Sequence, residues 1–326
     1  MATTNGSKAE GAPSNGTHPN GTYKPLPIVV AGAGCVGLFL AHLLARSPIP
    51  NRIIVVEPLQ PDKTVTRAMA HQPLIFPLFT QAGLMDELSR IGSFGNGMCY
   101  RTSAKNGSKL IVGKKFKEGE TGQLLLPQGK FQDALMRSIE KDGKSEIKLG
   151  WQVIGFQDEE KGVSVKIQHE DGRKEVLEAE YLIGADGAKS RVRKLLNIPF
   201  DGVTLPAQLV ATDIMYDFHA HGFYDSNHIV DAENWGHIGR INNEGMWRLS
   251  YGMPADTSDE AIYASVEEKI KKMLPDGGSS GFEIKHVAPY KPQQRCVDAL
   301  WTGRVGLCGD AAHCMDYPTL QYSYLN

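Results

Sequence analysis

The stretch Ile28-Val29-Val30-Ala31-Gly32-Ala33-Gly34-Cys35-Val36-Gly37 decides the fold of this chain. Its branched apolar residues favour a buried strand, and the pattern Gly-x-Gly-x-x-Gly then opens a helix. Glycines Gly32, Gly34 and Gly37 let the backbone approach a pyrophosphate, toward which the helix directs its N–H groups and positive dipole end. A second apolar run, 53–56, ends at Glu57, whose carboxylate can accept hydrogen bonds from an adenosine ribose. The alternative interpretation is an ordinary βαβ unit with a glycine-rich turn.

The composition of the 326 residues indicates a globular protein of one or two domains. A net charge of −2 gives no sign of a nucleic-acid partner or of a polybasic membrane surface. The five cysteines show no C-x-x-C spacing, which argues against a disulfide framework and for a reducing, cytoplasmic compartment.

The first segment, 1–24, is rich in Gly, Asn, Ser and Thr and lacks the apolar core of a signal peptide, so we predict a disordered tail. The longest apolar stretch, 27–45, contains glycines and His42. It fits a buried strand and helix better than a membrane span, so no membrane span is predicted.

A second informative stretch is 180–193, where an apolar strand runs into Asp186-Gly187 and then into a helix with Ser190 as the expected N-cap. Asp186 would lie at the carboxyl end of a strand, where ligands bind in open α/β sheets. A carboxylate there suits hydroxyls or bound water, and Arg193 can balance anionic charge. The alternative is a turn aspartate and a surface arginine.

The third stretch, 303–313, is a short strand that ends in Gly309-Asp310-Ala311. The small residues let the backbone approach a ligand, and Asp310 can accept a hydrogen bond from a polyol chain. We interpret Cys308 as a core residue and Cys314 as a loop residue rather than as a redox pair.

Other segments carry local signals. Arg67 follows the second strand in a loop and is either a solvated cation or a guanidinium near the dinucleotide. Apolar periodicity predicts helices over 76–91, from Gln128 to near Gly143, and over 257–274, the last opened by a Thr257/Glu260 capping box. Turn residues predict a hairpin over 100–112 turned at 106–107 and a three-stranded meander with a turn at 171–172.

Alternating runs between 205 and 253 read as antiparallel strands of a second domain. Its aromatic residues are candidates for a substrate pocket, although aromatic residues on strands are more often core: Tyr216, Tyr224, Trp235 and Tyr251. Histidines 219, 221, 228 and 237 match no compact metal-ligand spacing, so we interpret them as pocket-wall or edge-strand residues and predict no metal.

Together, the three glycine and aspartate motifs and Glu57 resemble the single-component, class A FAD-dependent aromatic hydroxylases, most like their fungal members around 247–251 and 289–295. The resemblance covers about 25–313. It implies an α/β fold in which a Rossmann-like FAD-binding domain of the glutathione-reductase type, 25–200 and 290–326, carries an inserted antiparallel substrate domain. That domain spans 201–289, with a contribution from about 70–125.

The resemblance also implies roles for individual residues. Gly32, Gly34 and Gly37 would pass the FAD pyrophosphate, and Glu57 would hold the adenosine ribose. Positions that contact FAD in the family match Arg67, Gln128, Asp186-Gly187 and Gly309-Asp310-Ala311. NAD(P)H would reduce the flavin, and O2 would supply the hydroxyl transferred to an electron-rich ring. No catalytic side chain is named.

This chain departs from the family after His313. The family continues into a Pro and a Gly-Gly-x-Gly turn before a helix, whereas this chain reads Cys314-Met315-Asp316-Tyr317-Pro318 and lacks those glycines.

Three hypotheses follow from these motifs and this departure. The first is an FAD- and NAD(P)H-dependent monooxygenase of fungal aromatic or secondary metabolism, acting on a phenolic or other electron-rich small molecule. The second is a C-terminally shortened, non-catalytic relative that binds FAD or only its ADP part. The third is a flavin-dependent epoxidase or oxidase. The sequence leaves open the substrate, the choice of NADH or NADPH and the oligomeric state.

Overall fold

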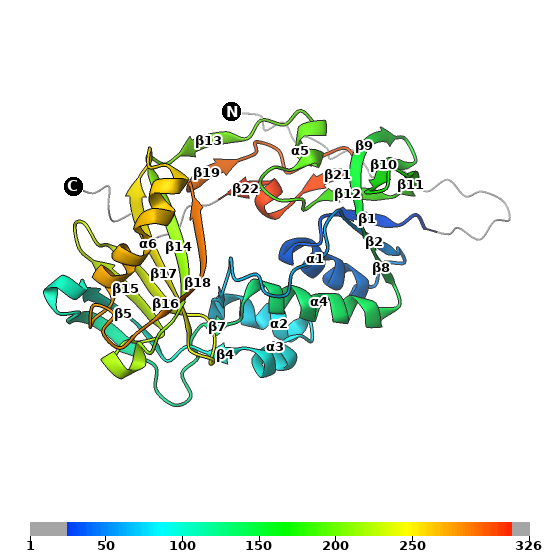
Figure 1. Cartoon of the computed structure of the whole chain (residues 1–326). Helices are drawn as coiled ribbons and strands as arrows, with labels where there is room; N and C mark the ends of the chain where they lie inside the picture. The colour runs from blue at the N-terminus through cyan, green and yellow to red at the C-terminus, as the bar shows by residue number, and fades with distance from the viewer. Residues whose placement is uncertain (1–24, 315–326) are drawn as a thin grey trace, which may run out of the picture.

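A six-stranded sheet forms the centre of the first lobe in the computed structural model, which describes residues 25–314 (Figure 1). The strand order is β20-β21-β12-β1-β2-β8, and every neighbouring pair is parallel except β20 with β21. The bounds are β1 (Ile28–Ala31), β2 (Ile53–Glu57), β8 (Ser145–Leu149), β12 (Tyr181–Gly184), β20 (Trp301–Thr302) and β21 (Val305–Leu307).

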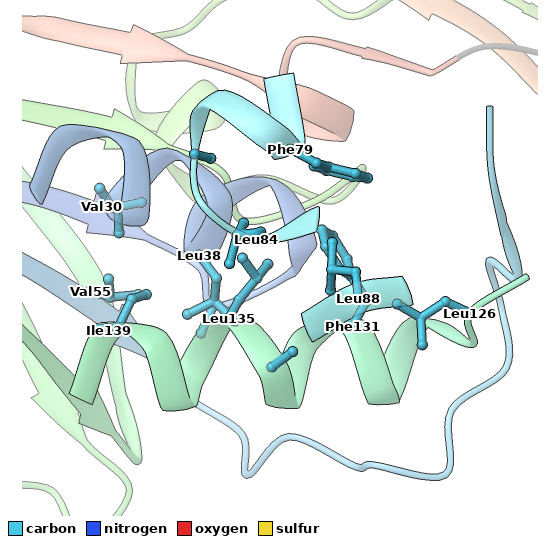
Figure 2. Packing of buried hydrophobic residues seen from close by; sticks show 14 of the residues in the cluster. Val30, Leu38, Val55, Phe79, Leu84, Leu88, Leu126, Phe131, Leu135 and Ile139 are labelled. Carbon is cyan, nitrogen blue, oxygen red and sulfur yellow. The ribbon is translucent and has the colours of Figure 1, made fainter. Parts of the chain in front are cut away.

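Both faces of this sheet are covered, which explains why its strands are continuously apolar. Val30 and Val55 pack against Leu38 and Leu135, which belong to the helices on one side (Figure 2). Val29 packs in a separate cluster with the meander on the other side. The covering elements are α1 (Cys35–Arg46), α4 (Gln128–Asp142), β9 (Trp151–Glu159), β10 (Gly162–His169) and β11 (Lys174–Ala179).

Most of the local predictions for this lobe are confirmed. The helix from Gln128 ends before Gly143, and the meander turns at 170–172 as expected. The helix predicted over 76–91 is wrong as a single element, because α2 (Phe76–Gln81) and α3 (Met85–Ile91) are separate. Gly83 has a φ of 69° between them, a left-handed conformation that ends a helix.

The second lobe is a seven-stranded sheet of order β18-β14-β17-β16-β15-β5-β6. Its strands are antiparallel except that β15 runs parallel to β5, a pairing that the sequence did not predict. β5 and β6 form the predicted hairpin and come from within the stretch 70–125. The bounds are β5 (Gly97–Thr102), β6 (Leu110–Lys115), β14 (Ala207–Met215), β15 (Ser226–Val230), β16 (Gly236–Arg240), β17 (Met246–Pro254) and β18 (Glu283–Tyr290).

Helix α6 (Asp259–Met273) covers one face of this sheet through Ile262, Val266 and Ile270, as its periodicity predicts. Its N-cap is Ser258, whose hydroxyl accepts a hydrogen bond from the Ala261 N–H at 3.2 Å. The predicted cap at Thr257 is therefore one residue too early.

The remaining elements of the described chain are short. They are β3 (Ala70–His71), β4 (Ser93–Phe94), β7 (Leu124–Leu125), α5 (Arg191–Leu195), β13 (Asp201–Thr204), β19 (Gln293–Cys296) and β22 (His313–Cys314), with 3₁₀ turns at Pro73–Ile75, Ala104–Asn106, His219–His221 and Gly309–Ala311. Among residues 25–314, no helix is both long enough and apolar enough to cross a membrane. The predicted tail 1–24 and the departure from the family pattern beyond Cys314 lie outside the described residues.

A buried ion pair fastens the second lobe to the first. Arg248 on β17 donates from Nε to Asp213 on β14 at 2.7 Å, and both residues are at most 7% exposed. The same guanidinium donates to the Arg67 carbonyl at 2.7 Å and to the Thr66 hydroxyl at 2.9 Å. These bonds hold the loop that follows β2 against the sheet of the second lobe.

Breaking this pair from one side is expected to be costly, because Asp213→Ala leaves a buried guanidinium without its counter-charge. We expect a loss of about 3–5 kcal/mol in the free energy of unfolding, measured by chemical denaturation. The double variant Asp213→Ala/Arg248→Ala should lose less than the sum of the two single variants. Glu267→Ala, which breaks the exposed pair with Lys271, is the control and should leave the free energy of unfolding nearly unchanged. Equal losses for the exposed and the buried pair would contradict this account.

Candidate functional site

The three motifs of the sequence meet at one edge of the central sheet. Gly184 lies in register with Ala31 of β1 on one side and with Leu307 of β21 on the other. The ladders continue past the strand ends, where the Ala185 N–H donates to the Ala31 carbonyl at 2.8 Å and the Cys308 N–H donates to the Gly184 carbonyl at 2.9 Å. The turns after β1, β12 and β21 are therefore neighbours at the carboxyl edge, as predicted.

Each glycine of the first motif has its own steric requirement. Gly32 has a φ of 106°, and a Cβ there would lie 2.4 Å from the Ala185 carbonyl oxygen. A Cβ on Gly37 would lie 2.0 Å from the Gly32 carbonyl oxygen. A Cβ on Gly34 meets nothing within 4 Å. Gly32 and Gly37 thus permit the turn and the close packing, whereas Gly34 leaves open space at the start of α1 for a ligand.

Glu57 ends β2 beside this turn. One carboxylate oxygen accepts a hydrogen bond from the Ala33 N–H at 2.7 Å, and the other accepts from the Leu59 N–H at 3.0 Å. Each oxygen keeps a second acceptor direction, so the carboxylate can still bind hydroxyl groups. Glu57 therefore lies against the glycine-rich turn with capacity for a ribose.

Asp186 has a structural task of its own. Its carboxylate accepts hydrogen bonds from the Arg191 N–H at 2.7 Å, from the Val192 N–H at 3.1 Å and from the Ser190 hydroxyl. It therefore caps α5 together with Ser190, whose side chain accepts from the Arg193 N–H as predicted. The neighbouring Gly187 has a φ of 78°, and a Cβ there would meet nothing within 4 Å. The role of Asp186-Gly187 toward a cofactor stays a prediction.

Arg193 is not a surface residue, so that interpretation is wrong. It is 5% exposed and donates to the Ala311 carbonyl at 2.8 Å and to the Ala188 carbonyl at 2.7 Å. Its guanidinium also lies over the Phe200 ring, 3.8 Å from the centroid. Arg193 therefore ties the second motif to the third.

The third motif packs against the first turn of α1. A Cβ on Gly309, which has a φ of 58°, would lie 3.0 Å from Cγ2 of Val36. Ala311 is buried, whereas Asp310 is exposed and its side chain makes no hydrogen bond or ion pair among residues 25–314. An exposed carboxylate at this edge is available to a polyol.

Helix α4 and the loop that carries Arg67 lie beside the three motifs. Gln128 begins α4, and its carbonyl lies 4.0 Å from Sγ of Cys35, the first residue of α1. The N-termini of both helices are therefore close together, an arrangement that favours a phosphate. Arg67 is exposed, and within the described part of the chain its guanidinium has no hydrogen bond or ion pair. A further residue, not predicted from the sequence, is Gln132, which lies one turn after Gln128 and donates to the Ala33 carbonyl at 2.6 Å.

The cysteines near this edge are unreactive. All five are free thiols, and burial raises the pKa of Cys35 and of Cys308 to about 11. Cys308 follows β21 directly rather than lying within it. Among the described residues, no group of three or more His, Cys, Asp or Glu side chains is placed to hold a metal ion.

The four aromatic candidates of the second lobe do not come together. Tyr216 and Tyr251 lie in the apolar cluster under α6, where Tyr216 donates to Asp276 at 2.8 Å. Tyr224 lies near Arg101, and Trp235 packs over Gly252. Their substrate role stays a prediction.

A row of polar rings lies on the face of this sheet opposite α6. Its two histidines, His228 and His237, were predicted from the sequence as pocket-wall or edge-strand residues, whereas their alignment with Tyr100 was not predicted. Tyr100, His228 and His237 are adjacent in register on β5, β15 and β16, and we call them the facing row. The Tyr100 and His228 rings stack at 5.0 Å, and the His228 and His237 rings lie 5.1 Å apart. Arg248 and Gly239 lie on the same face of the sheet as the facing row. Arg248 donates to the Thr66 hydroxyl, and Gly239 lies close to the Met69 side chain, so this face is turned toward the first lobe. Period-two alternation along β15 and β16 was the signal available for finding it.

The FAD binding domain family model matches residues 26–319. The chain belongs to this family. It is 29% identical to para-nitrophenol 4-monooxygenase of Pseudomonas sp. (strain WBC-3) over 88% of this chain and 71% of that protein. It is 27% identical to 6-hydroxy-3-succinoylpyridine 3-monooxygenase of Pseudomonas putida over 88% and 72%. It spans about half the length of 3-(3-hydroxy-phenyl)propionate/3-hydroxycinnamic acid hydroxylases such as that of Comamonas testosteroni.

Solved structures agree with this fold. A crystal structure of p-nitrophenol 4-monooxygenase from Pseudomonas putida superposes with a TM-score of 0.83 at 27% identity, over 92% of this chain and 75% of that one. A ternary complex of aklavinone-11 hydroxylase with FAD and aklavinone has the same fold, with a TM-score of 0.78 at 22% identity over 90% and 58%. The chain is thus an FAD-binding protein of the flavin-dependent monooxygenase class, with a Rossmann-like domain and a sheet domain as predicted.

We expect the variants Gly34→Ala and Gly37→Ala to distinguish an effect on FAD affinity from an effect on the stability of the fold. The first adds a methyl group where the backbone is open, so we expect the thermal unfolding midpoint to change little and FAD affinity to fall about tenfold or more. The second forces the methyl group into the Gly32 carbonyl and should lower the unfolding midpoint itself. Flavin fluorescence titration and thermal unfolding measure the two effects. Unchanged FAD affinity in Gly34→Ala would place the pyrophosphate elsewhere.

His237 is expected to make stability depend on pH. Burial, with the nearby charges of His228 and Arg248, lowers the pKa of His237 to about 3, whereas an unfolded histidine binds a proton below pH about 6.5. The free energy of unfolding should therefore fall as the pH drops below that value, by up to about 1.4 kcal/mol per pH unit from this residue. Denaturation of wild type and His237→Asn between pH 7 and pH 4.5 measures the difference, and identical slopes would contradict this assignment.

Proposed function

We propose that the protein is an FAD-dependent monooxygenase that uses NAD(P)H and O2 to hydroxylate a phenolic or other electron-rich small aromatic molecule. The observation that carries the proposal is the meeting of all three family motifs at one sheet edge, beside the loop that Arg248 fastens to the second lobe. A lone glycine motif fits any nucleotide-binding protein, whereas this set fits a dinucleotide held across two lobes.

The residues at the edge fit FAD. The open backbone at Gly34 and the N-termini of α1 and α4 would hold the pyrophosphate, and Glu57 would hold the adenosine ribose. The unpaired carboxylate of Asp310 would bind the ribityl hydroxyls, and Arg67 would add positive charge. When bound, FAD supplies the hydride acceptor and the site at which O2 is activated.

The facing row would orient the substrate. Burial lowers the pKa of His228, so its imidazole is neutral and can accept a hydrogen bond from a phenolic hydroxyl. Tyr100 stacks on that ring and fixes its orientation. Removing the phenolic proton raises the electron density of the ring, which hydroxylation requires. Relatives that act on nitrophenol and on hydroxyphenyl acids support this substrate class.

The setting of the reaction is part of the same proposal. The resemblance to fungal members is our basis for assigning the protein to fungal aromatic or secondary metabolism. Five unpaired cysteines and a pyridine-nucleotide reductant suit the cytoplasm. NADPH and NADH are both candidates.

Two alternatives are separated by simple measurements. A non-catalytic relative would retain FAD or ADP without consuming NAD(P)H. An epoxidase or oxidase would consume NAD(P)H or O2 and yield a product without a new ring hydroxyl, which oxygen-18 labelling distinguishes.

His228→Leu tests the assigned role most directly. We expect kcat/KM for a phenol to fall by about 100-fold, the usual contribution of a positioned proton acceptor, while FAD stays bound. His221→Leu, on the other side of the sheet beside Tyr216, is the control and should keep the wild-type rate. The assay follows NADPH or NADH consumption and product mass over a panel of phenols. Absence of turnover in wild type with FAD, both reductants and the whole panel would overturn the proposed function.

A further inference from the structure

A separate hollow of about 590 Å³ lies at the end of the second lobe, away from the facing row. Its apolar wall atoms come from Phe94, Met215, Tyr216 and Trp247, and its polar groups from Asn96, Asp217, His219, Asn242 and Asn243. We call it the His219 hollow. Its size is that of ordinary small-molecule sites. None of its lining residues belongs to the three motifs or to the facing row.

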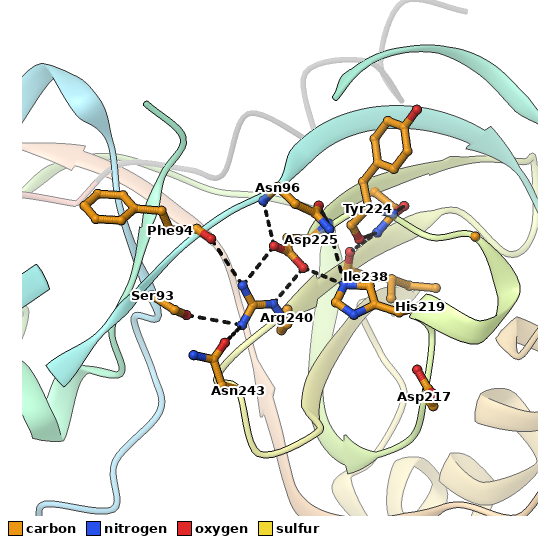
Figure 3. Close-up of polar contacts among 12 residues, drawn as sticks. Ser93, Phe94, Asn96, Asp217, His219, Tyr224, Asp225, Ile238, Arg240 and Asn243 are labelled. Carbon is orange, nitrogen blue, oxygen red and sulfur yellow. Dashed lines mark hydrogen bonds and ion pairs between the residues drawn. The ribbon is translucent and has the colours of Figure 1, made fainter. Parts of the chain in front are cut away.

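The floor of the hollow is a closed ion pair. Arg240 donates from Nε and Nη2 to Asp225 at 2.7 and 2.9 Å, and from its other N–H groups to Ser93, Asn243 and the Phe94 carbonyl (Figure 3). These contacts use all five guanidinium donors. Arg240 therefore has no donor left for an anion, and its charge is balanced by Asp225.

His219 is the group left to bind a ligand. Its Nε2 lies 2.8 Å from Asp225, and because a carboxylate only accepts, Nε2 must be the donor (Figure 3). In the neutral ring, Nδ1 is then an acceptor, and it has no hydrogen bond among residues 25–314. The Asn96 N–H also donates to Asp225, at 2.7 Å, so the carboxylate that orients the ring is itself fixed.

The other polar groups of the hollow are the carboxylate of Asp217 and the side-chain amides of Asn242 and Asn243, whose oxygens already accept hydrogen bonds from within the protein. Asp217 is exposed on its rim and carries a carboxylate with free acceptor positions. Among the described residues that line the hollow, no cationic group remains unpaired to offset the Asp217 charge, so an anionic ligand would be repelled. Phe94 is 42% exposed and offers the face or edge of its ring.

We propose that the His219 hollow binds a neutral aromatic alcohol or amine, whose hydroxyl or amino group donates to Nδ1 of His219. The ring contacts the apolar wall, and a second donor on the ligand reaches the Asp217 carboxylate. This site lies on the opposite face of the sheet from His237, as the alternation from His237 to Arg240 along β16 shows. It is therefore independent of the cofactor edge and of any turnover there.

Two substitutions at one position separate the ligand contact from the structural one. His219→Gln keeps an N–H donor for Asp225 and loses the acceptor at Nδ1. His219→Asn keeps a polar group near the Nδ1 position and loses the bond to Asp225. His169→Gln is the control, because His169 also pairs with an aspartate, Asp171, in the other lobe.

The probe is a phenol that carries a photoreactive diazirine, applied to the FAD-loaded full chain, with labelled peptides mapped by mass spectrometry. We expect labelling within 215–219 or 242–247, displaced by catechol and not by benzoate. In His219→Gln this labelling should fall about fivefold, the value of one lost hydrogen bond, while His219→Asn and His169→Gln keep most of it.

The labelling results test the His219 hollow independently of the proposed monooxygenase function. Labelling only of peptides that contain Tyr100, His228 or His237 would overturn the inference and leave the proposed function standing. Equal labelling of wild type and His219→Gln, equal displacement by benzoate, or no labelling of the hollow would also overturn it. Thermal unfolding of each variant confirms that the comparison is made between folded proteins.

Discussion

Two buried arginine–aspartate pairs hold the lobes of this protein together. Arg248 with Asp213 secures the loop that carries Arg67, and Arg240 with Asp225 secures the segment 93–96. Both arginines lie on adjacent strands of one sheet, and each reaches backbone or hydroxyl groups of the first lobe. A buried charge without its partner is strongly unfavourable, so each pair constrains where the sheet can dock.

This docking sets the geometry of the candidate site. The central sheet alone brings the three motifs together, whereas the facing row lies on the sheet of the second lobe. The loop after β2 is linked directly to the sheet of the second lobe, because Arg248 donates to the Arg67 carbonyl at 2.7 Å and the Thr66 hydroxyl donates to Asp213 at 2.5 Å. The sheet that carries the three motifs and the sheet that carries the facing row are therefore coupled through a few hydrogen bonds around one guanidinium.

The meeting of the three motifs at one sheet edge was predictable from the sequence, because each motif is a local signal: an apolar strand, a tight turn and a helix or 3₁₀ start. Parallel strands then bring their carboxyl ends together without further information. Sequence patterns did not predict which face of a sheet is turned toward the first lobe, because that depends on residues far apart in the chain. Whether Tyr251 or His237 faces the first lobe depends on which side α6 covers, and alternation alone does not say which. The task of Asp186 at α5 was missed for a related reason, since the same short motif serves a helix cap and a ligand.

The parallel pairing of β15 with β5 has a consequence for the integrity of the second lobe. Its sheet is built from strands that are more than a hundred positions apart in the chain, so the segment 201–289 is not a self-sufficient module. Cut out alone, it would expose the backbone of β15 as an unpaired edge, which invites aggregation. The second lobe thus completes its sheet only when the earlier segment that contains β5 has also folded against it.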